Sequence, residues 1–86
     1  MKLHLYDEDV ETVVEPQDKW EMQALRILRK KFGDTYIEHY DLDHVNKAVS
    51  FDVYMLMRKH KYATLAALFE LLNIISNHKH AKVTEE

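Results

Sequence analysis

The segment that decides the fold is Thr64-Leu65-Ala66-Ala67-Leu68-Phe69-Glu70-Leu71-Leu72-Asn73-Ile74-Ile75-Ser76, because nearly every position in it is apolar. At about 100° per residue, the apolar side chains cover some 220° of a helix and leave a narrow polar strip. Such a helix has to be covered on nearly every side. We therefore predict that it is the central helix of the domain, and that a chain of 86 residues has barely enough other structure to cover it.

The composition describes one small globular domain. The chain is 47% hydrophobic and 31% charged, a balance that suits neither a disordered nor a membrane-spanning protein. It contains no cysteine, which excludes disulfides and thiolate metal sites and favours a cytoplasmic location. No apolar run approaches the ~18 residues needed to span a bilayer. We expect a single domain over residues 1–77 and a polar tail over 78–86 that frays.

Two further helices are predicted upstream of the central one. Asp18 and Glu21 form an acidic capping pair that predicts the start of a helix, and Gly33 predicts its end. The apolar residues between Asp18 and Gly33 fall in one arc of this helix. A second helical pattern runs from Asp43 to about Lys61. Ser50 is a candidate cap within it, so this segment is interpreted as one helix or as two joined at a bend.

The first sixteen residues have the period of a β-strand. Alternating residues from Lys2 to Tyr6 and the β-branched run from Val10 to Val14 predict a hairpin, with a single strand as the alternative. We expect residues 7–9 to close it, with Asp9 in the left-handed conformation. Residues 34–42 fit a third strand or a short helical turn, and we favour the turn.

These elements predict an α+β fold that is mostly helical, with an N-terminal strand or hairpin packed on three to four helices. The expected core consists of apolar residues from all of these elements: Leu3, Leu5, Val14, Leu25, Leu28, Phe32, Val45, Val49, Val53, Leu56, Leu65, Leu68, Leu72 and Ile75.

Neither catalysis nor metal binding is predicted. With one glycine, the chain has no glycine-rich phosphate loop, and none of its serines or threonines lies in a nucleophile motif. Two histidine clusters, at 39–44 and 78–80, are better interpreted as surface and capping residues than as a metal site. We therefore expect no enzymatic activity, no metal and no cofactor.

Protein binding is the function that the sequence favours. A helix apolar on nearly all sides, a strand with an unpaired edge and five tyrosines are all features of contact surfaces. We expect an adaptor, inhibitor or assembly factor, of the kind found among viral and mobile-element accessory proteins, that acts as a homodimer. The candidate contact residues are Leu68, Phe69, Leu71, Ile75, Tyr36 and Tyr40.

A nucleic-acid-binding regulator is the alternative hypothesis. Two basic clusters, at 26–31 and 58–62, provide cations for phosphates and a tyrosine that can stack on a base. The hypothesis requires both clusters to lie on one face. Its candidate residues are Arg26, Arg29, Lys30, Arg58, Lys59, Lys61 and Tyr62.

Overall fold

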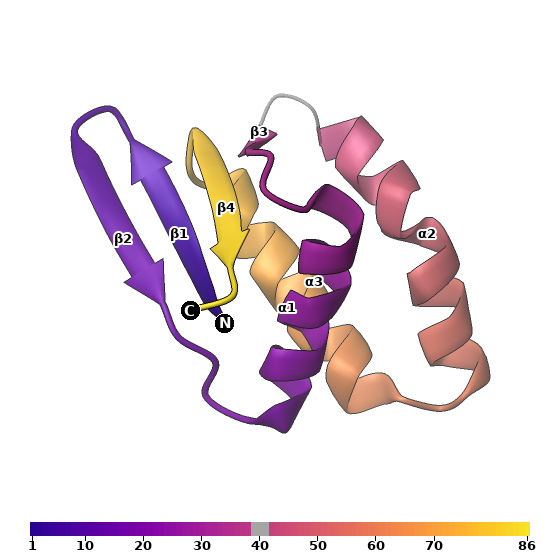
Figure 1. Ribbon diagram of the computed structural model, residues 1–86. Helices are drawn as coiled ribbons and strands as arrows, with labels where there is room; N and C mark the ends of the chain where they lie inside the picture. Colours follow the sequence, from indigo (N-terminus) through magenta and orange to yellow (C-terminus); the bar gives the residue numbers. More distant parts are fainter. Residues whose placement is uncertain (39–41) are drawn as a thin grey trace.

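The described part of the chain combines a four-stranded antiparallel sheet with three helices, in a computed structural model that covers residues 1–38 and 42–86 (Figure 1). In chain order the elements are β1 (Lys2–Asp7), β2 (Val10–Val14), α1 (Lys19–Phe32), β3 (Ile37–Glu38), α2 (Leu42–Arg58), α3 (Tyr62–Ser76) and β4 (His80–Thr84). The predicted α+β class, the N-terminal hairpin and the central C-terminal helix are confirmed.

The last strand lies inside the sheet. The strand order is β2-β1-β4-β3, so β4 pairs with β1 on one side and with β3 on the other, which places the two ends of the chain side by side (Figure 1). Ala81 and Val83 of β4 are buried. The prediction that residues 78–86 fray is therefore wrong, because two apolar side chains at alternate positions suffice to complete the buried face of the sheet.

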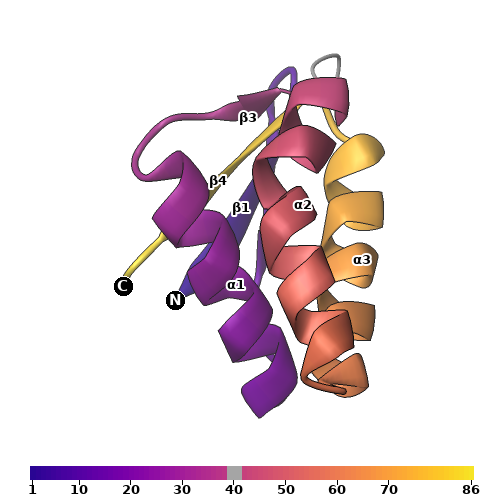
Figure 2. The ribbon, with the colours of Figure 1, turned by 90° about the vertical axis from the view of Figure 1, so that its right-hand side faces the viewer.

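The helices all lie on one side of the sheet. Figures 1 and 2 show α1 and α3 next to the sheet and α2 on the far side of that pair. The segment 43–61 contains one helix, α2, which ends at Arg58, and not two helices joined at a bend. Ser50 does not cap a second helix, since its hydroxyl donates to the carbonyl of Lys47 within the same helix.

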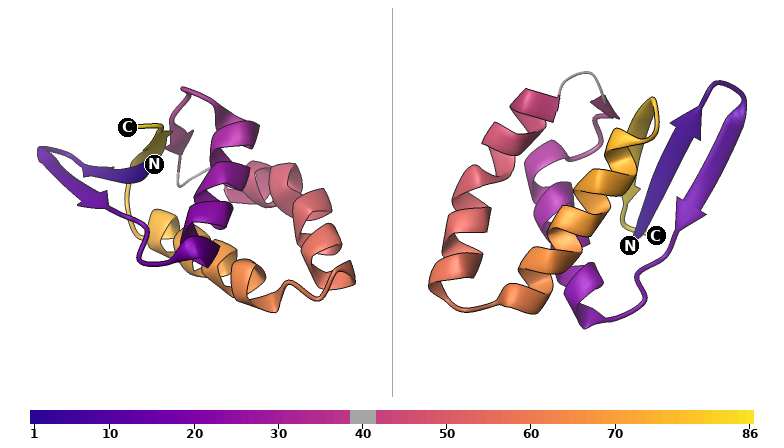
Figure 3. Two further views of the ribbon diagram at one scale, coloured as in Figure 1. Left: turned by 60° about the horizontal axis from the view of Figure 1, so that its bottom comes forward. Right: turned by 180° about the vertical axis from the view of Figure 1, so that it is seen from behind.

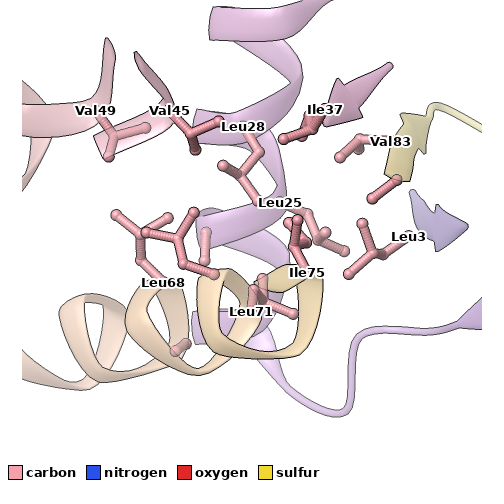
Figure 4. Packing of buried hydrophobic residues seen from close by; sticks show 14 of the residues in the cluster. Leu3, Leu25, Leu28, Ile37, Val45, Val49, Leu68, Leu71, Ile75 and Val83 are labelled. Atoms are coloured by element: carbon pink, nitrogen blue, oxygen red, sulfur yellow. The ribbon is translucent and has the colours of Figure 1, made fainter. Parts of the chain in front are cut away.

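One core runs from the sheet through α1 and α3 to α2 (Figure 4). Leu3 and Val83 fill its sheet end, Leu25 and Leu28 of α1 its middle, and Val45 and Val49 its α2 end. All fourteen residues of the expected core belong to this cluster, with Val14, Phe32 and Val53 partly buried at its margin. Because α3 contacts this core along its length, its apolar circumference is mostly covered by its own chain.

Local signals set the bounds of α1 as predicted. Oδ1 of Asp18 accepts from the amide of Glu21, and Gly33 ends the helix with a φ of 57°. The hairpin turn differs from the prediction. Its two turn residues are Glu8 and Asp9, since Asp7 pairs with Val10, and Glu8 is the left-handed one with a φ of 43°.

The segment between α1 and α2 also differs from the prediction. Ile37 and Glu38 pair with Ala81 and His80 as strand β3, in place of the favoured helical turn. Thr35 does not start a helix, because its hydroxyl donates to the carbonyl of Phe32 and extends the end of α1. Residues 39–41, on which the rest of that prediction falls, lie outside the described residues.

Candidate functional site

The β1–β2 hairpin projects from the helical body, as the left-hand view of Figure 3 shows. In β2, residues 10–13 are exposed on both faces of the strand, and Val14 alone is half-buried. Val10 is 62% exposed and Val13 is 44% exposed. In the part of the chain that the structure describes, no strand pairs with the outer edge of β2. The unpaired edge expected from the sequence is therefore the edge of β2.

The tip of the hairpin is fixed to the segment that enters β4. A hydrogen bond with His78 Nδ1 holds the pKa of the Asp7 carboxylate below its usual value, and the amide of Lys79 donates to the same carboxylate over 3.0 Å. Lys79 Nζ also lies 3.0 Å from Glu8 Oε1. These contacts hold β1 and β4 in register while β2 stays open on its other side.

Three of the predicted contact residues are buried and therefore do not form a surface. Leu68, Leu71 and Ile75 are buried in the chain's own core, on the side of α3 that faces the sheet, α1 and α2 (Figure 4). Their assignment to self-association is wrong, because a helix can be apolar on most sides when two layers of the same domain cover it. Phe69 is half-exposed on the outer face of α3 and remains available for contact.

Tyr36 is half-exposed but packs within its own chain. Its ring meets Tyr6 edge-on, with the centroids 5.7 Å apart, and meets His80 in the same way at 5.1 Å. Tyr6 and His80 stack at 5.0 Å, and partial burial raises the pKa of Tyr6. This cluster lies on the sheet face opposite the helices. Tyr40, the other tyrosine proposed for contact, lies outside the described residues.

The basic cluster at 26–31 is partly used within the fold. Arg29 donates to the carbonyls of Gly33 and Val83 and pairs with Asp34 at 2.7 Å. Lys31 Nζ lies 3.2 Å from a carboxylate oxygen of Asp52, close enough for an ion pair although the angles do not make a hydrogen bond. Arg26 and Lys30 remain exposed on the outer face of α1. Arg29 is therefore a structural residue that fastens β4 to α1.

The cluster at 58–62 lies at the other end of α1. Its loop and the start of α3 meet the start of α1 at a hollow of about 320 Å³. A rise of about 1.5 Å per residue puts Arg29 about 15 Å along α1 from Lys19, which lines the hollow. Arg29 and the cluster at 58–62 thus lie toward opposite ends of this helix, while the exposed Lys19, Arg26 and Lys30 share one side of it. The shared face that the alternative hypothesis requires stays a prediction. The hollow is lined by Lys19, Trp20, Gln23, His60, Lys61, Tyr62, Ala63 and Thr64.

Sequence reasoning missed Lys19, Trp20 and His60 as members of this hollow. Trp20 lies next to the expected helix cap and has the spacing of a core residue, but it is 41% exposed. A contact between residues 19–23 and 60–64 is non-local, so no spacing rule detects it. Its one sequence signal is the chain's single tryptophan close to a cluster of basic residues.

No group of three or more histidine, aspartate or glutamate side chains among the described residues is arranged to hold a metal ion. In the same part of the chain, none of the helices combines the length and the apolar content that a membrane span requires.

No protein-family model matches the chain, and neither the curated proteins nor the solved structures include a significant match. The interpretation of function therefore depends on the surfaces described above.

Proposed function

We propose that this chain is a non-enzymatic protein-binding module, an adaptor, inhibitor or assembly factor, and that it docks through the open edge of β2. The observation that carries the proposal is that, among residues 1–38 and 42–86, β2 pairs with β1 alone and is exposed on both faces from Val10 to Val13. The cytoplasmic location and the kinship with viral accessory proteins expected from the sequence belong to the same proposal.

The register of the hairpin determines which main-chain groups point outward. Asp7 and Val10 flank the two-residue turn as a hydrogen-bonded pair, and hydrogen-bonded and non-hydrogen-bonded pairs then alternate along an antiparallel ladder. Thr12 is therefore bonded to Leu5. The N–H and C=O groups of Glu11 and Val13 point away from β1 and are available to another strand.

The edge carries little of the usual protection against pairing. Natural edge strands are commonly guarded by charged side chains, above all lysine, by proline or by a bulge, and β2 has one charged residue, Glu11. The five residues of β2 include neither lysine nor proline, and four of them are β-branched. The pairing with β1 runs through β2 without a bulge, since successive residues have successive partners. The edge is thus a suitable template for a further strand.

The occupant that fits this edge is a second copy of the chain. If two copies of β2 pair antiparallel about a two-fold axis at Thr12, Val10 meets Val14 of the second copy and Glu11 meets Val13 of the second copy. Within Val10–Val14 no like charges face each other in this register, and Asp9 lies opposite Glu15 of the second copy just beyond the strand ends. The two Glu11–Val13 pairs supply four main-chain hydrogen bonds, because each such pair exchanges two. The two sheets then form one continuous sheet across the axis.

The test removes the outward donor without changing the inner ladder. Val13→Pro deletes an N–H that points to the open edge, a place where strands tolerate proline, whereas the matched control Val13→Thr keeps it. Two hydrogen bonds per dimer are lost, each worth about 0.5–1.5 kcal/mol, which weakens the dimer by about 5- to 150-fold. Sedimentation velocity from about 10 µM to about 1 mM monitors the shift from 10.3 kDa to twice that mass.

We expect the natural chain and Val13→Thr to dimerise with similar affinity and Val13→Pro to remain largely monomeric with an unchanged circular dichroism spectrum. If Val13→Pro does not fold, Glu11→Pro removes the equivalent outward donor. A natural chain that stays monomeric at about 1 mM contradicts the choice of a second copy as the occupant. Equal dimerisation by the proline variant contradicts the choice of this edge.

A further inference from the structure

The hollow between the first turns of α1 and α3 is a second site, separate from β2. Lys19, Trp20 and Gln23 line it from α1, and residues 60–64 line it from the α2–α3 loop and α3. A hydrogen bond of 2.6 Å from the hydroxyl of the buried Thr64 to Gln23 Oε1 joins the two helices at this site. This hydrogen bond joins the two walls of the hollow.

The lining is cationic. Lys19 and Lys61 contribute two positive charges and His60 a titratable ring, and no carboxylate is among the described residues that line the hollow. The nearest acidic side chains in sequence, Asp18 and Glu21, accept hydrogen bonds from amides of the α1 cap. Both carboxylates keep their negative charge while they cap α1, but neither lines the hollow, where the charged side chains are those of Lys19 and Lys61.

The lining is also aromatic. Trp20 and Tyr62 are 41% and 55% exposed, so each ring has a free surface that a planar group can cover. Lys19 Nζ lies 5.3 Å from the centroid of the Trp20 ring, and His60 Nδ1 lies 2.9 Å from the hydroxyl of Tyr62. Cations and aromatic rings are thus interleaved within one hollow, as in sites that hold a phosphate beside a base.

His60 occupies a strained position. The amide of Lys61 donates to the carbonyl of Leu56, and the amide of His60 to the carbonyl of Met57, which is the hydrogen-bond pattern of a Schellman motif. His60 is its left-handed residue, with a φ of 57°, where glycine is the usual choice. His60 thus presents its ring to the hollow from a backbone position that glycine would adopt with less strain.

We propose that this hollow binds a nucleoside phosphate, with the phosphate between Lys19 and Lys61 and the base stacked on Trp20 or Tyr62. The same chemistry is available from a free nucleotide and from one nucleotide of a single-stranded nucleic acid. The adjacent cations Arg58 and Lys59 are exposed and suit a strand that continues past the hollow. The proposal does not depend on dimerisation, because neither Val13 nor the edge of β2 lines the hollow.

Trp20 is the chain's single tryptophan and reports on the site directly. The intact protein is titrated with adenosine monophosphate, and at matched ionic strength with inorganic phosphate, with adenosine and with an oligoglutamate peptide. We expect saturable quenching of Trp20 fluorescence by adenosine monophosphate, at least about tenfold tighter than by phosphate or adenosine, because charge and stacking act together. An oligonucleotide of about eight nucleotides is the second arm. Binding at least about tenfold tighter than the mononucleotide identifies a strand as the source, and equal binding identifies a free nucleotide.

Substitutions within the hollow test its residues. Lys61→Ala should weaken binding by about five- to tenfold with an unchanged melting temperature, because Lys61 is exposed, and the control Lys30→Ala on the outer face of α1 should not. His60→Gly should raise the urea midpoint and weaken binding, a combination that a purely structural histidine does not produce.

Three results overturn the proposal. One is the absence of saturable quenching by either nucleotide ligand up to about 10 mM, well above ordinary nucleotide affinities. Another is equal weakening by Lys30→Ala and Lys61→Ala. The third is tighter binding of the oligoglutamate peptide than of adenosine monophosphate, which identifies an acidic protein segment as the ligand.

Discussion

Replacing Val83 by alanine tests whether the end of the chain is an integral strand of the sheet. Val83 is 2% exposed, faces the helices and pairs with Leu3, so the substitution removes two methyl groups from the core. At about 0.8 kcal/mol per buried methylene the transfer contribution is about 1.6 kcal/mol, and the residual cavity brings the loss to about 2–3 kcal/mol. For a domain of this size, the corresponding fall in melting temperature is about 8–24 °C.

The control lies one residue away on the same strand. Lys82 points to the opposite face of the sheet, where its Nζ lies 5.2 Å from the ring centroid of Tyr36. Lys82→Ala should therefore cost less than about 1 kcal/mol. Urea unfolding followed by far-ultraviolet circular dichroism gives both values. If Val83→Ala costs no more than Lys82→Ala, β4 is not part of the core and the account of the sheet is wrong.

Two further perturbations probe the hairpin. Glu8→Gly should raise the free energy of unfolding by about 0.5 kcal/mol in urea, because relief of the left-handed φ of 43° outweighs the exposed contact with Lys79, and a loss of stability contradicts that geometry. The hydrogen bond with His78 lowers the pKa of Asp7 in the folded state, so its stabilisation is present above the unfolded pKa of about 3.9 and is lost as the pH falls through the folded value. We therefore expect the urea midpoint of the natural chain to fall between about pH 6 and pH 3 by more than the midpoint of Asp7→Asn does. If both midpoints fall by the same amount, Asp7 does not stabilise the fold in this way.

Local signals predicted most of the fold. The bounds of α1 follow from Asp18, Glu21 and Gly33, which act within one turn of their own position. The hairpin follows from alternation within fourteen residues. These elements depend on neighbours in sequence, and they form as expected.

The errors concern contacts between distant segments. Residues 80–84 contain only Ala81 and Val83 as apolar positions, and their pairing with β1 at the start of the chain has no local signature. Ile37 becomes a strand residue because β4 is there to pair with it. The prediction for α3 is wrong for the same reason. Its apolar circumference predicts a surface that a second chain covers, but the sheet, α1 and α2 of the same chain cover Leu68 and Ile75.

Of the two candidate sites, one was predictable from local sequence and the other depends on contacts between distant segments. An unpaired strand edge was expected, because an N-terminal hairpin always has one outer edge, and β2 provides it. The hollow was not expected, because Trp20 and Tyr62 are brought together by the packing of α1 on α3. Tertiary structure assembled that site from residues forty positions apart.

Disulfide trapping at Thr12 tests the central proposal, that two copies pair through β2. The chain has no cysteine, so Thr12→Cys introduces a single thiol. On the two-fold axis, the two Cα atoms of a non-hydrogen-bonded pair lie about 4.5 Å apart, within the range that a disulfide spans. Under mild oxidation we predict rapid formation of a covalent dimer by Thr12→Cys and slow formation by Asn73→Cys on the exposed face of α3. Equal rates for the two variants would contradict pairing through this edge.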